Sequence, residues 1–121
     1  MKLITLNIHS IVEYNYEEKL EKFAEMIAYL KPDIFVLQES NQSRDAEIVS
    51  EKELIGCVGI NMPIKKDNNA FAVSKLLRKK GLNYNWYWNS AKQGYDIFDE
   101  GLAIFSLKPI ENFEYFYMSN I

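Results

Sequence analysis

The stretches Leu3-Ile-Thr-Leu-Asn-Ile-His-Ser10 and Pro32-Asp-Ile-Phe-Val-Leu-Gln-Glu-Ser40 decide the fold class. Each is a short apolar run that predicts a buried strand, over 3–8 and 33–38, and each ends in polar side chains. Between them, apolar residues recur at helical spacing over about 17–30, and Asn15 with Glu18 is a capping-box pattern. Strand, helix and strand in this order predict an α/β fold with a crossover connection, which leaves the adjacency and direction of the strands open.

The rest of the chain predicts one further helix and more strands within a single domain. Asn68 or Asn69 can cap a helix over about 70–80, which ends in three cations and then Gly81. Residues 40–68 give mixed signals and predict loops for the most part. We expect the remaining strands at 84–89, 101–106 and 112–118, with a polar loop over 90–100. The large aromatic residues of 84–88 are expected to pack in the core.

Composition excludes several classes of protein. The 121 residues carry a net charge of −3 and a pI near 5.2, which argues against a protein that grips the nucleic-acid backbone through a basic face. Cys57 is the only cysteine, so no internal disulfide is expected and a reducing cytoplasm is the favoured location. No signal peptide and no run of about 18 apolar residues is visible, so no membrane partner is expected.

Polar residues at the ends of the predicted strands are the candidates for chemistry. They are Asn7, His9, Glu39, Asn41 and the acidic segment 96–100. A carboxylate beside an amide oxygen suits Mg²⁺ better than zinc, and such an ion would polarise a phosphoryl oxygen for attack by water. Each residue also has a simpler interpretation. Glu39 could be solvated, Asn7 could bond a turn, His9 could be structural, and the acidic segment could be a surface loop.

With these motifs the chain resembles the endonuclease/exonuclease/phosphatase superfamily of Mg²⁺-dependent phosphoesterases. Leu6-Asn7 is similar to its first motif, Leu37-Gln38-Glu39 to its second, and Asp99-Glu-Gly-Leu-Ala-Ile-Phe-Ser-Leu-Lys-Pro-Ile110 to a strand that follows in many members. Asp67-Asn-Asn-Ala-Phe71 and Gly94-Tyr-Asp-Ile-Phe-Asp-Glu-Gly101 most resemble the bacterial branch that includes maltose 6′-phosphate phosphatases.

The resemblance implies roles for individual residues. Glu39 would be the main carboxylate on Mg²⁺ (or Mn²⁺), and Asn7 would bind metal-linked water or phosphate. Glu100 matches an acidic position that supports the catalytic histidine in the nucleases of the superfamily. Substrate contact is the role expected of three residues, namely His9, Asn41 and Asp96. Two departures from relatives, Leu107 and Gln93, affect the expected substrate contacts and not the metal site.

Length is the largest departure from the family pattern. Members are longer four-layer α/β/β/α sandwiches of two similar halves, and the second half supplies the general-base histidine, an Asp-x-Asn pair and a terminal Asp-His. These motifs are not found in 1–121, so the resemblance implies an N-terminal half, one mixed sheet with helices on one face. Its uncovered sheet face predicts self-association.

The function implied is hydrolysis of a sugar phosphomonoester by the full-length form, with this chain inactive or nearly so by itself. Two alternatives stay open. One is a non-catalytic binding or assembly module that keeps the fold without the reaction. The other is a DNase I-like nuclease, against which the acidic balance counts.

Overall fold

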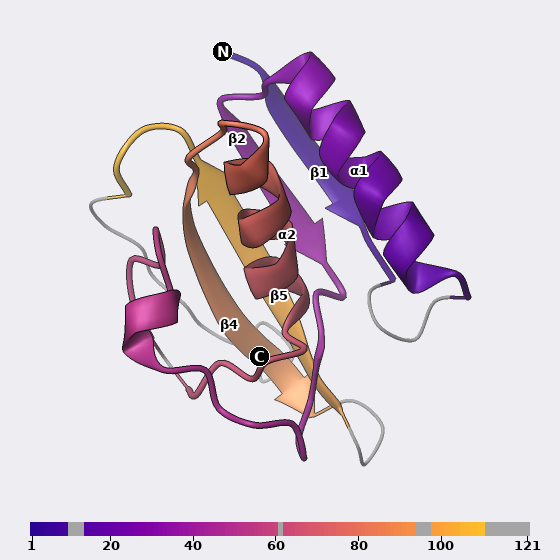
Figure 1. Cartoon of the computed structure of the whole chain (residues 1–121), viewed down its shortest axis with the longest axis vertical. Coiled ribbons are helices and arrows are strands. Elements are labelled where there is room, and N and C mark those ends of the chain that lie inside the picture. Colours follow the sequence, from indigo (N-terminus) through magenta and orange to yellow (C-terminus); the bar gives the residue numbers. More distant parts are fainter. Residues whose placement is uncertain (10–13, 61, 94–97, 111–121) are drawn as a thin grey trace, which may run out of the picture.

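A computed structural model describes residues 1–9, 14–60, 62–93 and 98–110. Two helices and four longer strands make up most of the fold. They are β1 (Leu3–Asn7), α1 (Tyr16–Leu30), β2 (Ile34–Gln38), α2 (Asn69–Lys79), β4 (Asn85–Gln93) and β5 (Phe98–Ser106). A short strand, β3 (Gln42–Ser43), and one turn of 3₁₀ helix (Glu51–Glu53) lie in the segment that predicted loops. The strands form a single mixed sheet, and α1 and α2 lie side by side on one of its faces (Figure 1). The expected α/β class and the helices on one face are therefore confirmed.

The strand register settles the adjacency that the sequence left open. Strand β1 runs parallel to β2, with Leu3 opposite Ile34 and Asn7 opposite Gln38. Strand β5 is antiparallel to β2, β3 and β4, so it lies at the centre of the sheet although it is the last described strand in the chain. The carboxyl ends of β1 and β2 consequently meet at one edge of the sheet.

The core forms between the sheet and the two helices. Phe35 of β2, Phe105 of β5 and Trp86 of β4 lie in one row across the sheet, and all three are fully buried. The rings of Phe35 and Phe105 stack with their centroids 4.5 Å apart. Burial of each such ring contributes about 1.5–3 kcal/mol. The aromatic residues of 84–88 thus pack in the core as predicted where they face the helices, which holds for Tyr84, Trp86 and Trp88.

The ends of the helices agree with the sequence at α2 and differ at α1. Asn68 caps α2, because its side-chain oxygen accepts the Phe71 N–H at 2.9 Å, and Gly81 follows the helix with φ +83°. The capping box expected at Asn15 and Glu18 is wrong. Asn15 has a left-handed backbone with φ 57° and makes no side-chain cap bond, whereas a capping side chain reaches the helix N–H groups from extended backbone.

The strand boundaries differ most near the polar segment 90–100. Strand β5 begins at Phe98, three residues before the predicted start, because Asp99 pairs with Gln42 of β3. Strand β4 continues to Gln93 past an irregularity between Ser90 and Lys92. The predicted strand 112–118 lies outside the described residues.

The sheet face opposite the helices is only partly covered. Leu3 and Thr5 of β1 and Leu102 of β5 point to this face, by the alternation of side chains along each strand, and all three are exposed. Leu3 is 64% exposed and Leu102 is 42% exposed. In the part of the chain that the structure describes, neither helix has the length and apolar character needed to cross a membrane.

Candidate functional site

The register of β1 and β2 creates the candidate site. Asn7 lies directly opposite Gln38, and the Ile8 N–H donates to the Gln38 carbonyl at 3.0 Å, which extends the pairing one residue beyond the strands. The segments that leave β1 and β2 then each turn at a residue with left-handed backbone, which is His9 (φ 51°) after β1 and Glu39 (φ 54°) after β2. Such backbone at a non-glycine residue costs of order 1–3 kcal/mol and is concentrated at functional sites.

The side chains that follow the two strands contact each other. His9 Nδ1 lies 2.9 Å from Glu39 Oε2, and the His9 N–H donates to the Asn7 side-chain oxygen at 3.1 Å. The side chains of His9 and Glu39 are 60% and 39% exposed, so a ligand can reach both. The structure therefore brings together three of the residues that the sequence predicted as a site.

The other predicted residues are placed differently from one another. Glu100 lies on β5 next to Gly101, whose carbonyl accepts the Ser40 N–H at 2.9 Å, so Glu100 belongs to the same edge of the sheet as Glu39. Asn41 is buried, and its side-chain oxygen accepts the Gly101 N–H at 3.4 Å. The Asn41 side chain therefore lies in the interior, where it bonds the backbone of β5. Asp96 lies outside the described residues.

The two acidic residues at the start of β5, Asp99 and Glu100, lie on opposite faces of the sheet. Asp99 is buried on the face toward the helices, where Gln42 Nε2 lies 3.2 Å and Arg44 Nε 3.3 Å from its carboxylate oxygens. Glu100, the next residue, points to the opposite face. Asp99 is therefore a structural carboxylate that joins β5 to the segment after β2.

Comparison with known proteins bears on what this site is. No family model matches the chain, and no curated protein matches it significantly. Among solved structures, an endonuclease/exonuclease/phosphatase family protein from Leptotrichia buccalis C-1013-b matches with a TM-score of 0.78 and 26% sequence identity. The match covers 93% of this chain and 39% of that protein, so the chain spans well under half the length of its neighbour. This likeness supports the endonuclease/exonuclease/phosphatase superfamily.

The superfamily implies a divalent metal, and the donor atoms at the strand ends fit Mg²⁺ or Mn²⁺ rather than zinc. Glu39 offers a carboxylate and Asn7 a neutral amide oxygen, both hard donors. Among the described residues, no group of three His, Cys, Asp or Glu side chains could hold a metal ion. An ion here would rely on one carboxylate with water or phosphate oxygens in the other positions, which is a common arrangement for Mg²⁺.

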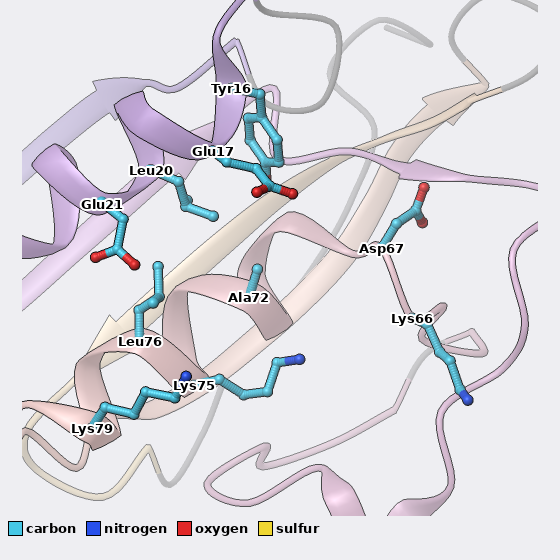
Figure 2. A pocket seen from close by; sticks show the side chains of 10 residues that line it. All are labelled: Tyr16, Glu17, Leu20, Glu21, Lys66, Asp67, Ala72, Lys75, Leu76 and Lys79. Atoms are coloured by element: carbon cyan, nitrogen blue, oxygen red, sulfur yellow. The ribbon is translucent and has the colours of Figure 1, made fainter.

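A separate hollow of about 410 Å³ lies between α1 and α2 (Figure 2). Glu17 and Glu21 line its α1 side and Lys75 and Lys79 its α2 side, over an apolar base. None of the residues predicted for the phosphoesterase site lines this hollow. Tyr16 stands at its end, and burial raises the pKa of the Tyr16 hydroxyl above its ordinary value.

Sequence reasoning missed the residues that hold the backbone after Glu39. The indole N–H of Trp88 donates to the Ser40 carbonyl at 2.6 Å, and Ser40 is fully buried. No local motif signals such a contact, because Ser40 and Trp88 are far apart in the sequence. The Ser40 hydroxyl also donates to Asn69, whose Asp67-Asn-Asn-Ala-Phe71 sequence stands out only through the family resemblance.

Proposed function

We propose that this chain is part of a metal-dependent phosphoesterase that hydrolyses a sugar phosphomonoester in the cytoplasm. The observation that carries the proposal is the group of Asn7, His9 and Glu39 at the carboxyl ends of two adjacent parallel strands. Ligand sites in sheets with helical connections lie at such ends. The structural neighbour from the same superfamily supports the reaction class, and the net charge of −3 disfavours a long polyanion as substrate.

Each of the three residues has a distinct role in this proposal. Glu39 and Asn7 hold the Mg²⁺ or Mn²⁺ ion, which when bound supplies the positive charge that polarises a phosphoryl oxygen. His9 orients Glu39 through Nδ1, at 2.9 Å, so the proton of a neutral His9 ring lies on Nδ1. The Nε2 atom of that tautomer is an acceptor, which suits a sugar hydroxyl.

The chain by itself is expected to turn over little or no substrate. His9 is its only histidine and contacts Glu39, so no second imidazole is present to act as general base. Absence of a general base costs about 10²- to 10⁴-fold in rate. Glu100 and Asp96 keep their proposed roles, in support of a catalytic histidine and in substrate contact respectively.

Metal binding is therefore the sharper test of the proposal. Mn²⁺ binding to the 121-residue chain is measured by electron paramagnetic resonance, with phosphate release from a panel of sugar phosphates measured in parallel. Glu39→Gln should abolish Mn²⁺ binding. Glu18→Gln on α1, where Glu18 pairs with Lys22 on the surface, is the matched control and should bind as the unaltered chain does. Equal Mn²⁺ affinity in the unaltered chain and in Glu39→Gln would contradict the proposal.

A non-catalytic assembly module is the second candidate function, and the partly covered sheet face favours it. We propose that a second copy of the chain packs on this face, which presents Leu3, Thr5 and Leu102 to solvent. Burial of apolar area supplies about 25 cal/mol per Å², which favours such an association. Sugar phosphate binding that requires Mn²⁺ supports the phosphoesterase, whereas a chain that self-associates but binds neither Mn²⁺ nor sugar phosphate supports the assembly module.

A further inference from the structure

The Asp67-Asn68-Asn69 sequence has no role in the site as described so far, yet all three residues bond the segment directly after Glu39. Asp67 accepts the Ser43 N–H at 3.0 Å, and Asn68 Nδ2 donates to the Gln42 side chain at 3.0 Å. Asn69 bonds closest to Glu39. The Ser40 hydroxyl donates to its side-chain oxygen at 2.6 Å, and its backbone N–H donates to the Asn41 carbonyl at 2.9 Å.

Asn69 is itself fixed on its other side. Its Nδ2 atom donates to the Tyr16 hydroxyl at 2.9 Å, so the side chain links the first turns of α1 and α2. Asn69 and Ser40 are both fully buried. Buried polar groups held at both ends keep a single orientation, because each alternative orientation leaves a buried donor or acceptor without a partner.

Ser40 is held on three sides as a result. Its hydroxyl bonds Asn69, its N–H donates to the Gly101 carbonyl at 2.9 Å, and its carbonyl accepts the indole N–H of Trp88 at 2.6 Å. Ser40 follows Glu39 directly in the chain. These contacts fix the backbone directly after Glu39, which has left-handed φ of 54°, and the Glu39 carboxylate extends from this backbone.

We propose that Asn69 is a positioning residue for the Glu39 carboxylate and acts through Ser40. The inference rests on the proposed function, since it takes Glu39 as the metal carboxylate. With a single carboxylate on the ion, affinity depends on how closely that group is held to its binding direction. Loss of a residue that orients a metal ligand typically lowers affinity 10- to 100-fold.

The experiment compares Asn69→Ala with Asn68→Ala in the complete chain. Asn68 is also fully buried, but its side chain caps α2 through the Phe71 N–H and donates to Gln42, where Asn69 instead accepts from Ser40. Both variants should lower the unfolding temperature. Only Asn69→Ala should weaken Mn²⁺ binding, by about 10- to 100-fold. Asn68→Ala should keep its dissociation constant within about threefold, because the Glu39 turn keeps its contacts.

Ser40→Ala provides a second variant if Asn69→Ala does not fold, since it removes only the hydroxyl that bonds Asn69. It should weaken Mn²⁺ binding in the same direction. Unchanged Mn²⁺ affinity in folded Asn69→Ala or Ser40→Ala overturns the inference, as does an equal loss in Asn68→Ala. Glu39→Gln distinguishes failure of the positioning role of Asn69 from failure of the proposed function. If Glu39→Gln loses Mn²⁺ and Asn69→Ala retains it, the proposed function stands and the positioning role fails. If neither variant changes Mn²⁺ binding, both fail.

Discussion

Replacement of Gly101 by alanine tests how tightly the site is tied to the core. A Cβ atom at Gly101 would lie 2.7 Å from Trp88 Cζ2 and closer still to the Nε1 and Cε2 atoms of that ring. Trp88 is fully buried and its indole bonds the Ser40 carbonyl, so the ring has no free space into which to move. Either β5 or the indole must shift.

The expected cost follows from two contributions. Forcing an extra carbon into a packed core costs about 1–3 kcal/mol. A shift of the indole that breaks its bond to Ser40 leaves a buried donor and acceptor unpaired, which adds about 1–3 kcal/mol. Gly101→Ala should therefore lower the free energy of unfolding by about 2–6 kcal/mol.

Urea unfolding followed by tryptophan fluorescence measures this change. Gly81→Ala is the control, because Gly81 has φ +83° and no atom lies within 4 Å of the added Cβ. Gly81→Ala should lower the free energy of unfolding by only about 1–2 kcal/mol, which is the cost of left-handed backbone at a non-glycine residue. The reasoning is refuted if Gly101→Ala unfolds at the same urea concentration as the control or at a higher one.

Two further predictions concern association and alkaline pH. Leu102→Lys should raise the dissociation constant for self-association at least about tenfold in sedimentation equilibrium, because it places a charge on the apolar sheet face. Met26 is an exposed methionine of α1 on the helix side, and Met26→Lys should leave that constant unchanged. Equal effects of the two variants would argue against association through the sheet face. Burial raises the pKa of Tyr84 to about 12, and its hydroxyl donates to the Pro32 carbonyl at 2.6 Å. An unfolded tyrosine ionises near pH 10, so the neutral form favours folding and this stability is present below about pH 10 and is lost as pH rises to about 12. Thermal unfolding from pH 9 to pH 12 should show this fall, and a fall of the same size in Tyr84→Phe would exclude Tyr84 as its cause.

The sequence predicts the parts of the fold that depend on local pattern. Apolar periodicity located α1 and β2 within a residue or two, and the polar residues before the second helix limited its cap to Asn68 or Asn69, of which Asn68 is the cap. Asn7 and Glu39 could be placed at one sheet edge because both follow apolar strands. The pairing of β1 with β2 in register makes that expectation specific.

What the sequence could not predict depends on contacts between distant residues. The bond between Trp88 and Ser40 and the burial of Asp99 beside Arg44 depend on β5 lying at the sheet centre, which local pattern does not encode. The early start of β5 has the same origin, since its first residues pair with both β3 and the far end of β4. Asn15 makes no cap bond although its side chain could cap α1, because its backbone is left-handed in the structure and side-chain type alone does not predict this.

The central place of β5 has a consequence for how the chain folds as it is made. Strand β2 has one partner in β1 and another in β5, and β5 is the last described strand to leave the ribosome. Synthesis adds roughly 5–20 residues per second, so the second edge of β2 waits for seconds without its partner. An apolar strand with an open edge is a template for wrong pairing. During synthesis the edge of β2 that β5 later covers is therefore open to mispairing until residues 98–106 have emerged.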